Sequence, residues 1–203
     1  MTKNIKLAGT SKDVKAYWDD KYTENETGWD IGYPSTPIKE YIDQLTDKSI
    51  KILIPGAGNA YEAEYLYLKG FKNVFVLDIS SVAIGSFKNR FPDFPDKHLL
   101  VEDFFSHNET YDLIIEQTFF CAINRADRLK YVEKVHSLLR NNGKLAGLLF
   151  NHEMEKEGPP FGGSPEEYEA LFSPYFTFNI FERSYNSIKP RNTREHFITF
   201  VKK

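Results

Sequence analysis

Two glycines and an acid have the spacing of a nucleotide site. Gly56 and Gly58 lie between an apolar run, residues 50–54, and a periodic segment, and a second apolar run ends at Asp78. This order of strand, glycine turn, helix, strand and acid is typical of a nucleotide-binding α/β unit. Glycine lets a ligand lie against the backbone, and a carboxylate can accept two hydrogen bonds from a ribose diol. A plain surface loop and a helix-capping role for Asp78 remain open alternatives.

Asp103 and Phe104 follow a third expected strand, residues 98–101. Ligands of a doubly wound sheet bind beyond the carboxyl ends of its parallel strands, so this acid and ring can hydrogen-bond and flank a purine. A solvated acidic turn is the alternative.

Three more titratable side chains fall at expected strand ends. Glu116 follows the strand at 111–115, and His152 and Glu153 follow the strand at 144–150. Each could assist a proton transfer, and the alternative for each is a solvated surface position.

The first 48 residues carry aromatic side chains in front of this core. A short amphipathic helix is expected over residues 11–22, with Ser11 as its N-cap and with Trp18 and Tyr22 close to one face. Trp29 lies in a glycine- and proline-punctuated segment that follows. These rings either attach the segment to the core or cover a binding site.

The remaining pattern predicts a single α/β domain. Further helices are expected at residues 36–46, 60–69, 81–91 and 125–140, the last with Leu129 among its buried residues and Asn142-Gly143 as its stop, and two β-like runs end the chain at 175–181 and 196–201. Five βα-type units and a terminal hairpin describe a mostly parallel, seven-stranded mixed sheet flanked by helices. We expect residues 1–203 to form one domain, with 1–48 as a helical lid and 49–203 as a Rossmann-like core.

Composition excludes several classes of protein. The net charge is −3 with acids and bases interspersed, so nucleic acid is not an expected partner. Residues 1–6 do not read as a signal peptide, and no apolar run is long enough to cross a membrane. Cys121 is the only cysteine, which excludes an internal disulfide and suits the cytoplasm, and the five histidines show no metal-ligand spacing.

The ligand expected at the glycine turn is a nucleoside without a pyrophosphate. A dinucleotide-binding turn has a third glycine where this chain has Tyr61, and that glycine lets the helix pack close beneath a pyrophosphate. A nicotinamide-dependent oxidoreductase would also continue with further βα units instead of a terminal hairpin.

With these residues in view, the chain resembles the S-adenosylmethionine-dependent methyltransferases of Rossmann-like fold, and more narrowly the thiopurine S-methyltransferase and halide/thiol methyltransferase family. The resemblance extends from Trp18 to about Lys202. It is carried by the order and spacing of Trp18, Tyr22, residues 29–34, the turn at 54–58, residues 77–80, 103–105 and 118–123, and Gly158-Pro-Pro-Phe161.

The resemblance implies S-adenosyl-L-methionine as cofactor and a set of residues that bind it. Gly56 is expected under the cofactor, Asp78 on the ribose hydroxyls, and Asp103 and Phe104 on the adenine, while Trp18, Tyr22 and Trp29 are similar to the family's cofactor-covering rings. Gln117 stands where a tyrosine is common and is the eighth expected cofactor-binding residue. Tyr22 and Ala57 also depart from the tryptophan and cysteine that halide/thiol relatives usually carry.

The implied reaction is methyl transfer to a small soft nucleophile, namely a thiol, thiopurine, halide or thiocyanate. No base is required for an acceptor that is already an anion, so no catalytic residue is assigned. Arg191 and Arg194 are candidates to attract such an anion, and Cys121 is expected to be a buried small residue instead of a nucleophile. A small-molecule acceptor and a cytoplasmic monomer are expected, with an oxidoreductase and a non-catalytic cofactor-binding protein as alternatives.

Overall fold

The structure is a computed structural model that describes residues 10–155 and 158–203. The expectation that residues 1–6 form no signal peptide lies outside the described residues. Among those described, no helix is long and apolar enough to cross a membrane.

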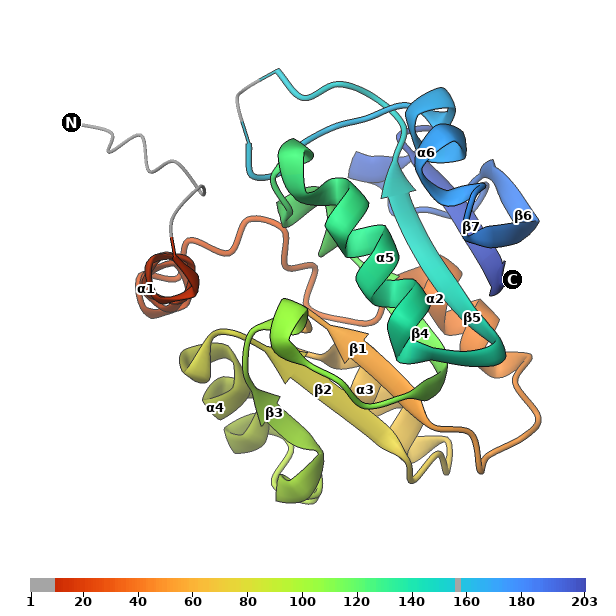
Figure 1. Cartoon of the computed structure of the whole chain (residues 1–203). Coiled ribbons are helices and arrows are strands. Elements are labelled where there is room, and N and C mark those ends of the chain that lie inside the picture. Colours follow the sequence, from red (N-terminus) through yellow and green to blue (C-terminus); the bar gives the residue numbers. More distant parts are fainter. Residues whose placement is uncertain (1–9, 156–157) are drawn as a thin grey trace.

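Seven strands form one sheet in the order β3-β2-β1-β4-β5-β7-β6 (Figure 1). The pairs among β1 to β5 are parallel, whereas β7 runs antiparallel to both β5 and β6. The predicted mostly parallel sheet with a C-terminal antiparallel hairpin is confirmed. The strands are β1 (Ile52–Pro55), β2 (Val74–Asp78), β3 (Leu99–Val101), β4 (Tyr111–Gln117), β5 (Leu139–Phe150), β6 (Phe176–Arg183) and β7 (Glu195–Lys202).

Helices cover both faces of the sheet because successive strand residues point to opposite sides. Leu53 packs in the core beneath α5 and α6, while Ile52 and Ile54 pack in the core beneath α2, α3 and α4. The helices are α1 (Ser11–Thr23), α2 (Thr36–Asp43), α3 (Tyr61–Leu68), α4 (Ser81–Arg90), α5 (Arg128–Leu138) and α6 (Pro165–Phe172).

The end of α5 and its buried face differ from the prediction. The helix ends at Leu138, and the chain passes directly into β5, so Asn142-Gly143 lies within that strand's irregular start instead of stopping a helix. Leu129 is 48% exposed, whereas Arg128 is 1% exposed. The guanidinium can be buried because Glu167 accepts a hydrogen bond from it at 2.6 Å and the Gly162 carbonyl accepts another at 2.8 Å.

Helix α1 lies across the carboxyl end of the sheet and contacts α4 (Figure 1). Its N-cap is Thr10, which forms a capping box with Asp13, so the prediction that Ser11 caps the helix is wrong. The Ser11 hydroxyl instead donates a hydrogen bond to Asp103, and the Ser80 hydroxyl donates one to Asp19 at 2.6 Å. Lys15 also donates a hydrogen bond to the Ser81 hydroxyl, and Asp19 accepts the N–H of Val82, so polar contacts attach this helix to the end of β3 and to the start of α4.

The junction between β4 and β5 has no room for a side chain at position 147. A Cβ atom there would lie 2.1 Å from the carbonyl oxygen of Glu116. Gly147→Ala should therefore lower the free energy of unfolding by about 1–3 kcal/mol in a denaturant titration. Gly85→Ala is the matched control, since a Cβ on this exposed α4 residue meets nothing within 4 Å and should stabilise the protein by about 0.5–1 kcal/mol. Equal effects from the two substitutions would contradict the prediction.

Candidate active site

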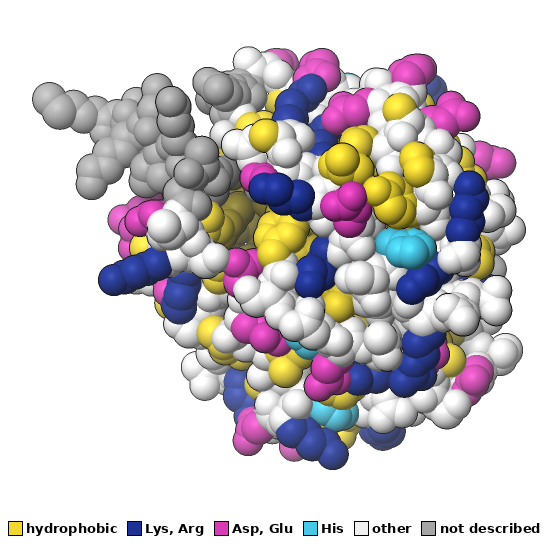
Figure 2. All heavy atoms as spheres, in the orientation of Figure 1, with side chains coloured by type: hydrophobic (Ala, Val, Ile, Leu, Met, Phe, Trp, Pro, Cys, Tyr) yellow, Lys and Arg dark blue, Asp and Glu magenta, His cyan; other side chains and the backbone are white. Residues whose placement is uncertain are grey.

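A cavity of about 720 Å³ lies at the carboxyl ends of the parallel strands, beneath α1. Figure 2 shows hydrophobic side chains inside the hollow beside that helix. Segments far apart in the sequence meet here, as expected for a doubly wound sheet. Its lining includes Ser11, Tyr17, Trp18, Tyr22, Trp29, Gly56, Asp78, Asp103, Phe104, Thr118, Phe119, Cys121, Asn124, Asp127, Lys130, Phe150, His152, Met154, Arg191 and Arg194.

Both glycines of the turn after β1 adopt the left-handed conformation, with φ of +56° at Gly56 and +54° at Gly58. A Cβ on Gly56 would lie 2.1 Å from Cδ2 of Phe119, and one on Gly58 would lie 2.5 Å from the Tyr22 hydroxyl. Both positions therefore require glycine for two reasons: the backbone is left-handed, and a ring packs where a Cβ atom would lie.

Asp78 ends β2 and is 6% exposed. One carboxylate oxygen accepts the N–H of Gly58 at 2.9 Å, and the other accepts the N–H of Ser80 at 2.8 Å. Burial raises the pKa of this carboxyl to about 6. The cap of α4 is Ser80, whose hydroxyl accepts the N–H of Ala83, so the capping alternative for Asp78 does not hold. Each carboxylate oxygen keeps a lone pair for a ligand hydroxyl.

Asp103 and Phe104 line the cavity together at the end of β3. Asp103 accepts hydrogen bonds from the N–H of Phe105 and from the Ser11 hydroxyl. The ring of Phe104 is 3% exposed and packs edge-on to Phe119, with ring centroids 5.2 Å apart. The solvated-turn alternative therefore does not describe this segment.

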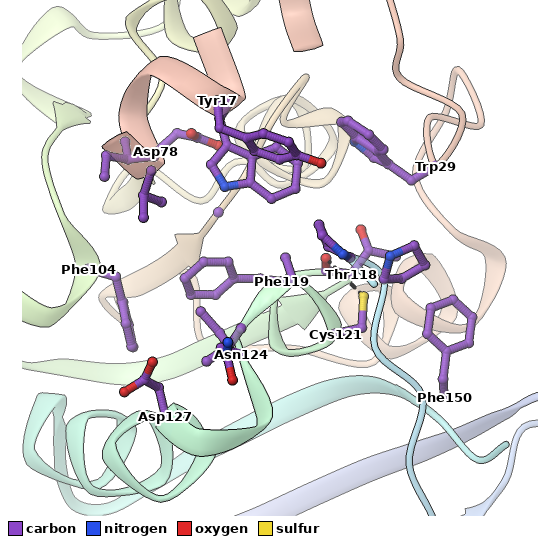
Figure 3. A pocket seen from close by; sticks show the side chains of 18 of the residues that line it. Tyr17, Trp29, Asp78, Phe104, Thr118, Phe119, Cys121, Asn124, Asp127 and Phe150 are labelled. Atoms are coloured by element: carbon purple, nitrogen blue, oxygen red, sulfur yellow. Dashed lines mark hydrogen bonds between the residues drawn. The ribbon is translucent and has the colours of Figure 1, made fainter. Parts of the chain in front are cut away.

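The expected aromatic cover is assembled from two segments. Trp29 packs edge-on against Trp18 and Tyr22, with centroids 5.5 and 5.9 Å away. In Figure 3 Tyr17 and Trp29 lie on the side of the cavity opposite Phe104 and Phe119. The sequence pattern placed Trp18 and Tyr22 on one face of the helix, and the contacts show that this face is turned toward the cavity.

Glu116 supports the wall of the cavity from below and does not line it. Its side chain is fully buried, and one oxygen accepts the N–H groups of Phe119 and Phe120, each at 2.8 Å. The other oxygen accepts the hydroxyl of Tyr131. Burial raises the pKa of this carboxyl to about 7. The sequence marks Glu116 only as an acid after an apolar strand, so this supporting role was missed.

Two other expected residues lie outside the cavity lining. Gln117 accepts a hydrogen bond from the Ser35 hydroxyl at 3.4 Å, and Glu153 is exposed and paired with Arg125. Cys121 does line the cavity but is 8% exposed, and burial raises the pKa of its thiol to about 12. It therefore remains a protonated, buried small residue, as expected.

Tyr17, Asn124 and Phe150 contribute to the cavity without having been singled out in the sequence. Tyr17 could have been found from its position on the aromatic face of α1. Asn124 and Phe150 carry no comparable signal, because only the packing of the chain brings them to the same edge. Among the described residues no group of three His, Cys, Asp or Glu side chains is arranged to hold a metal ion.

The sheet order, with the cavity at the carboxyl ends of the parallel strands, is that of a Rossmann-like α/β fold. The structure is similar to that of 1,6-didemethyltoxoflavin-N1-methyltransferase from Burkholderia thailandensis, with a TM-score of 0.77 and 13% identity, covering 98% of this chain and 93% of that chain. The sequence model described as thiopurine S-methyltransferase matches residues 14–202. The chain therefore belongs to the thiopurine S-methyltransferase family, whose cofactor is S-adenosylmethionine.

The chain is also similar in sequence to two plant methyltransferases. The chain is 30% identical to probable thiol methyltransferase 2 from Arabidopsis thaliana over 81% of this chain and 74% of that protein. It is 26% identical to thiocyanate methyltransferase 1 from Brassica oleracea over 88% of this chain and 81% of that protein.

The stability of the fold should depend on the protonation of Glu116. Because burial raises its pKa above the unfolded value of about 4.3, its stabilising contribution is present below pH 4 and is lost as the pH rises through 7. Relative to Glu116→Gln, the wild-type free energy of unfolding should fall by about 3 kcal/mol between pH 4 and 8. Denaturant titrations across this range measure the difference, with Glu153→Gln as the exposed control. A constant difference would show that the side chain does not titrate with folding.

Proposed function

We propose that this protein transfers the methyl group of S-adenosylmethionine to a small soft nucleophile, namely a thiol, thiopurine, halide or thiocyanate. The observation that carries the proposal is one continuous cavity, which joins the glycine turn and Asp78 to an end lined by Phe150, Arg191 and Arg194. The first part suits the cofactor, and the second leaves room for an acceptor beside it.

The proposed cofactor site uses the residues that the cavity brings together. Adenine lies at Asp103 and Phe104, the ribose hydroxyls bond to Asp78, and the backbone at Gly56 lies against the nucleoside. Trp18, Tyr22 and Trp29 cover the sulfonium end. Gln117 bonds to Ser35, close in sequence to the Trp29 segment, so we propose that it acts on the lid instead of on the cofactor itself.

A dry, ring-lined site favours this reaction. Transfer from a sulfonium to an anion consumes both charges, and water stabilises the separated ions more than the charge-dispersed transition state. Trp18, Trp29 and Phe119 line the cavity, and we propose that they reduce the access of water to the reacting groups. Tryptophan faces beside the sulfonium add about 0.5–2 kcal/mol of cation–π attraction. Alignment of donor and acceptor supplies the larger part of the reduction in the activation free energy, up to about 7–11 kcal/mol.

The position and charge of Arg191 favour an acceptor that carries negative charge. Its side chain is 11% exposed, and one terminal nitrogen donates to the Trp29 carbonyl at 2.7 Å. The other, Nη1, is buried without a hydrogen-bond partner among the described residues and lies 3.6 Å from Glu195. Because Arg191 and Arg194 both line the cavity, this end presents positive charge to a thiolate, thiocyanate or halide.

The remaining expectations are part of the same proposal. Residues 1–48 act as a lid on a core of residues 49–203, and the chain works as a cytoplasmic monomer with no nucleic-acid partner. Tyr61 in place of a third glycine and the antiparallel end of the sheet favour methyl transfer over a nicotinamide-dependent reaction. A non-catalytic cofactor-binding protein would not need the open, cationic end of the cavity.

Incubation with S-adenosylmethionine labelled in the methyl group tests the activity. Butanethiol, 6-mercaptopurine, iodide and thiocyanate serve as acceptors, and extractable or volatile labelled product is measured. Product is expected with at least one acceptor. Binding of S-adenosylhomocysteine without product from any of them would favour the non-catalytic alternative.

Asp78→Asn should weaken the binding of S-adenosylhomocysteine by about 1–3 kcal/mol at pH 7, because one acceptor for the ribose diol is lost. The wild-type affinity should also fall about tenfold between pH 7 and 5, because the carboxyl with its pKa of about 6 becomes protonated. The variant should lack this pH dependence. Calorimetry measures both effects, with Asp127→Asn as a cavity-lining control. Unchanged affinity in Asp78→Asn would remove this residue from the site.

A further inference from the structure

Glu116, His152 and Glu153 could each take a proton from an acceptor according to the sequence, and the structure places them in three different environments. Glu116 is sealed below the cavity, with both carboxylate oxygens accepting hydrogen bonds. Glu153 is exposed, paired with Arg125 and outside the cavity lining. Only His152 of these three lines the cavity.

The acids that line the cavity already have other partners. Asp78 accepts two backbone N–H groups at the glycine turn, Asp103 is bonded to Ser11, and Asp127 pairs with Lys130 at 2.7 Å. Among the lining side chains that remain, the imidazole of His152 has a ring nitrogen whose lone pair can accept a proton. His152 is therefore the side chain in the cavity best suited to serve as a base.

The ring of His152 belongs to the acceptor end of the cavity. It packs edge-on to Phe150, with ring centroids 5.7 Å apart, and Met154 lines the cavity beside it. Its Nδ1 atom is buried and has no hydrogen-bond partner among the described residues. No described carboxylate therefore holds the ring through that nitrogen, and the imidazole is not committed to an ion pair there.

The backbone that carries His152 is fixed although it lies outside the strands and helices. The His152 carbonyl accepts the N–H of Gly163 at 3.1 Å, and a Cβ on Gly162 would lie 2.1 Å from the same carbonyl oxygen. The Gly162 carbonyl in turn accepts hydrogen bonds from Arg128 at 2.8 Å and Arg125 at 3.1 Å. These contacts attach the segment to the start of α5, so the imidazole is held on a supported wall.

We propose that His152 is the general base for acceptors that enter as protonated thiols, an inference that rests on the proposed function. The thiol proton passes to an imidazole nitrogen as the sulfur lone pair attacks the methyl carbon. The bond between that carbon and the sulfonium breaks, and its electron pair stays on the departing sulfur. The products are a thioether and S-adenosylhomocysteine, and the imidazolium then releases its proton to water.

This assignment makes the effect of His152 depend on the acceptor. A thiol as acidic as a cysteine side chain, with a pKa of about 8.5, is mostly protonated at pH 7, and a simple alkyl thiol is a weaker acid still, so its transfer benefits from a base. Iodide carries no proton, and its transfer uses only the positioning of donor and acceptor. A residue that merely shapes the cavity would affect both acceptors in parallel.

The test compares His152→Gln with the wild-type protein, using 2-mercaptoethanol and iodide as acceptors at pH 7. The kcat/KM for the thiol should fall about 100-fold, whereas that for iodide should stay close to wild type. Free imidazole should restore part of the thiol rate. His136→Gln controls for loss of a histidine outside the cavity, and Met154→Leu controls for a neighbouring lining residue without proton chemistry.

Parallel loss with both acceptors would assign His152 a structural role and overturn the proposal, as would an unchanged thiol rate. Thermal unfolding and binding of S-adenosylhomocysteine show whether the variant is folded. Absence of product from the wild-type protein with every thiol tested would overturn the proposal for His152, and absence of product with 6-mercaptopurine, iodide and thiocyanate as well would overturn the proposed function itself. These failures appear in the wild-type protein and are therefore distinguishable from the effect of the variant.

Discussion

The lack of side chains at positions 56 and 58 is the constraint on which the site depends. Phe119 and Tyr22 each pack where a Cβ of the glycine turn would otherwise lie. One ring comes from the end of β4 and the other from α1, so the turn is where the sheet and the N-terminal segment meet. Any larger residue there would displace a ring that forms the wall or cover of the cavity.

Buried polar groups hold the surrounding wall in place. Glu116 uses its carboxylate to fix the backbone at Phe119 and Phe120, and Arg128 uses its guanidinium to fix the carbonyl of Gly162. These hydrogen bonds offset the cost of burying a polar or charged group, and among the described residues only Nε of Arg128 in this pair of side chains is buried without a partner. Rigid support of this kind suits a reaction whose acceleration rests on alignment more than on acid–base chemistry.

The cavity is lined by both acidic and basic side chains, to which the proposed function gives different roles. In the site that we propose, the carboxylates of Asp78 and Asp103 line the part of the cavity where hydroxyl and amino groups of the nucleoside donate to them. In the same proposed site, Arg191, Arg194 and His152 line the part of the cavity that receives the soft anion or thiol. In the proposed reaction, the rings that line the cavity reduce the access of water to the charges that are neutralised.

The sequence by itself determined the mostly parallel sheet with its antiparallel hairpin, the glycine turn and the acids at the strand ends. Apolar periodicity and glycine are local features of the chain, and the resemblance to a family rests on the order of motifs along it, so neither requires knowledge of the tertiary structure. It did not determine that Leu129 is exposed while Arg128 is buried, since helical periodicity cannot reveal a distant partner such as Glu167. Only the tertiary structure set Glu116 beneath the cavity, Gln117 outside it and His152 within it. Neighbouring strand residues point to opposite faces, and loop residues have no periodicity, so their access to a ligand is decided by packing alone.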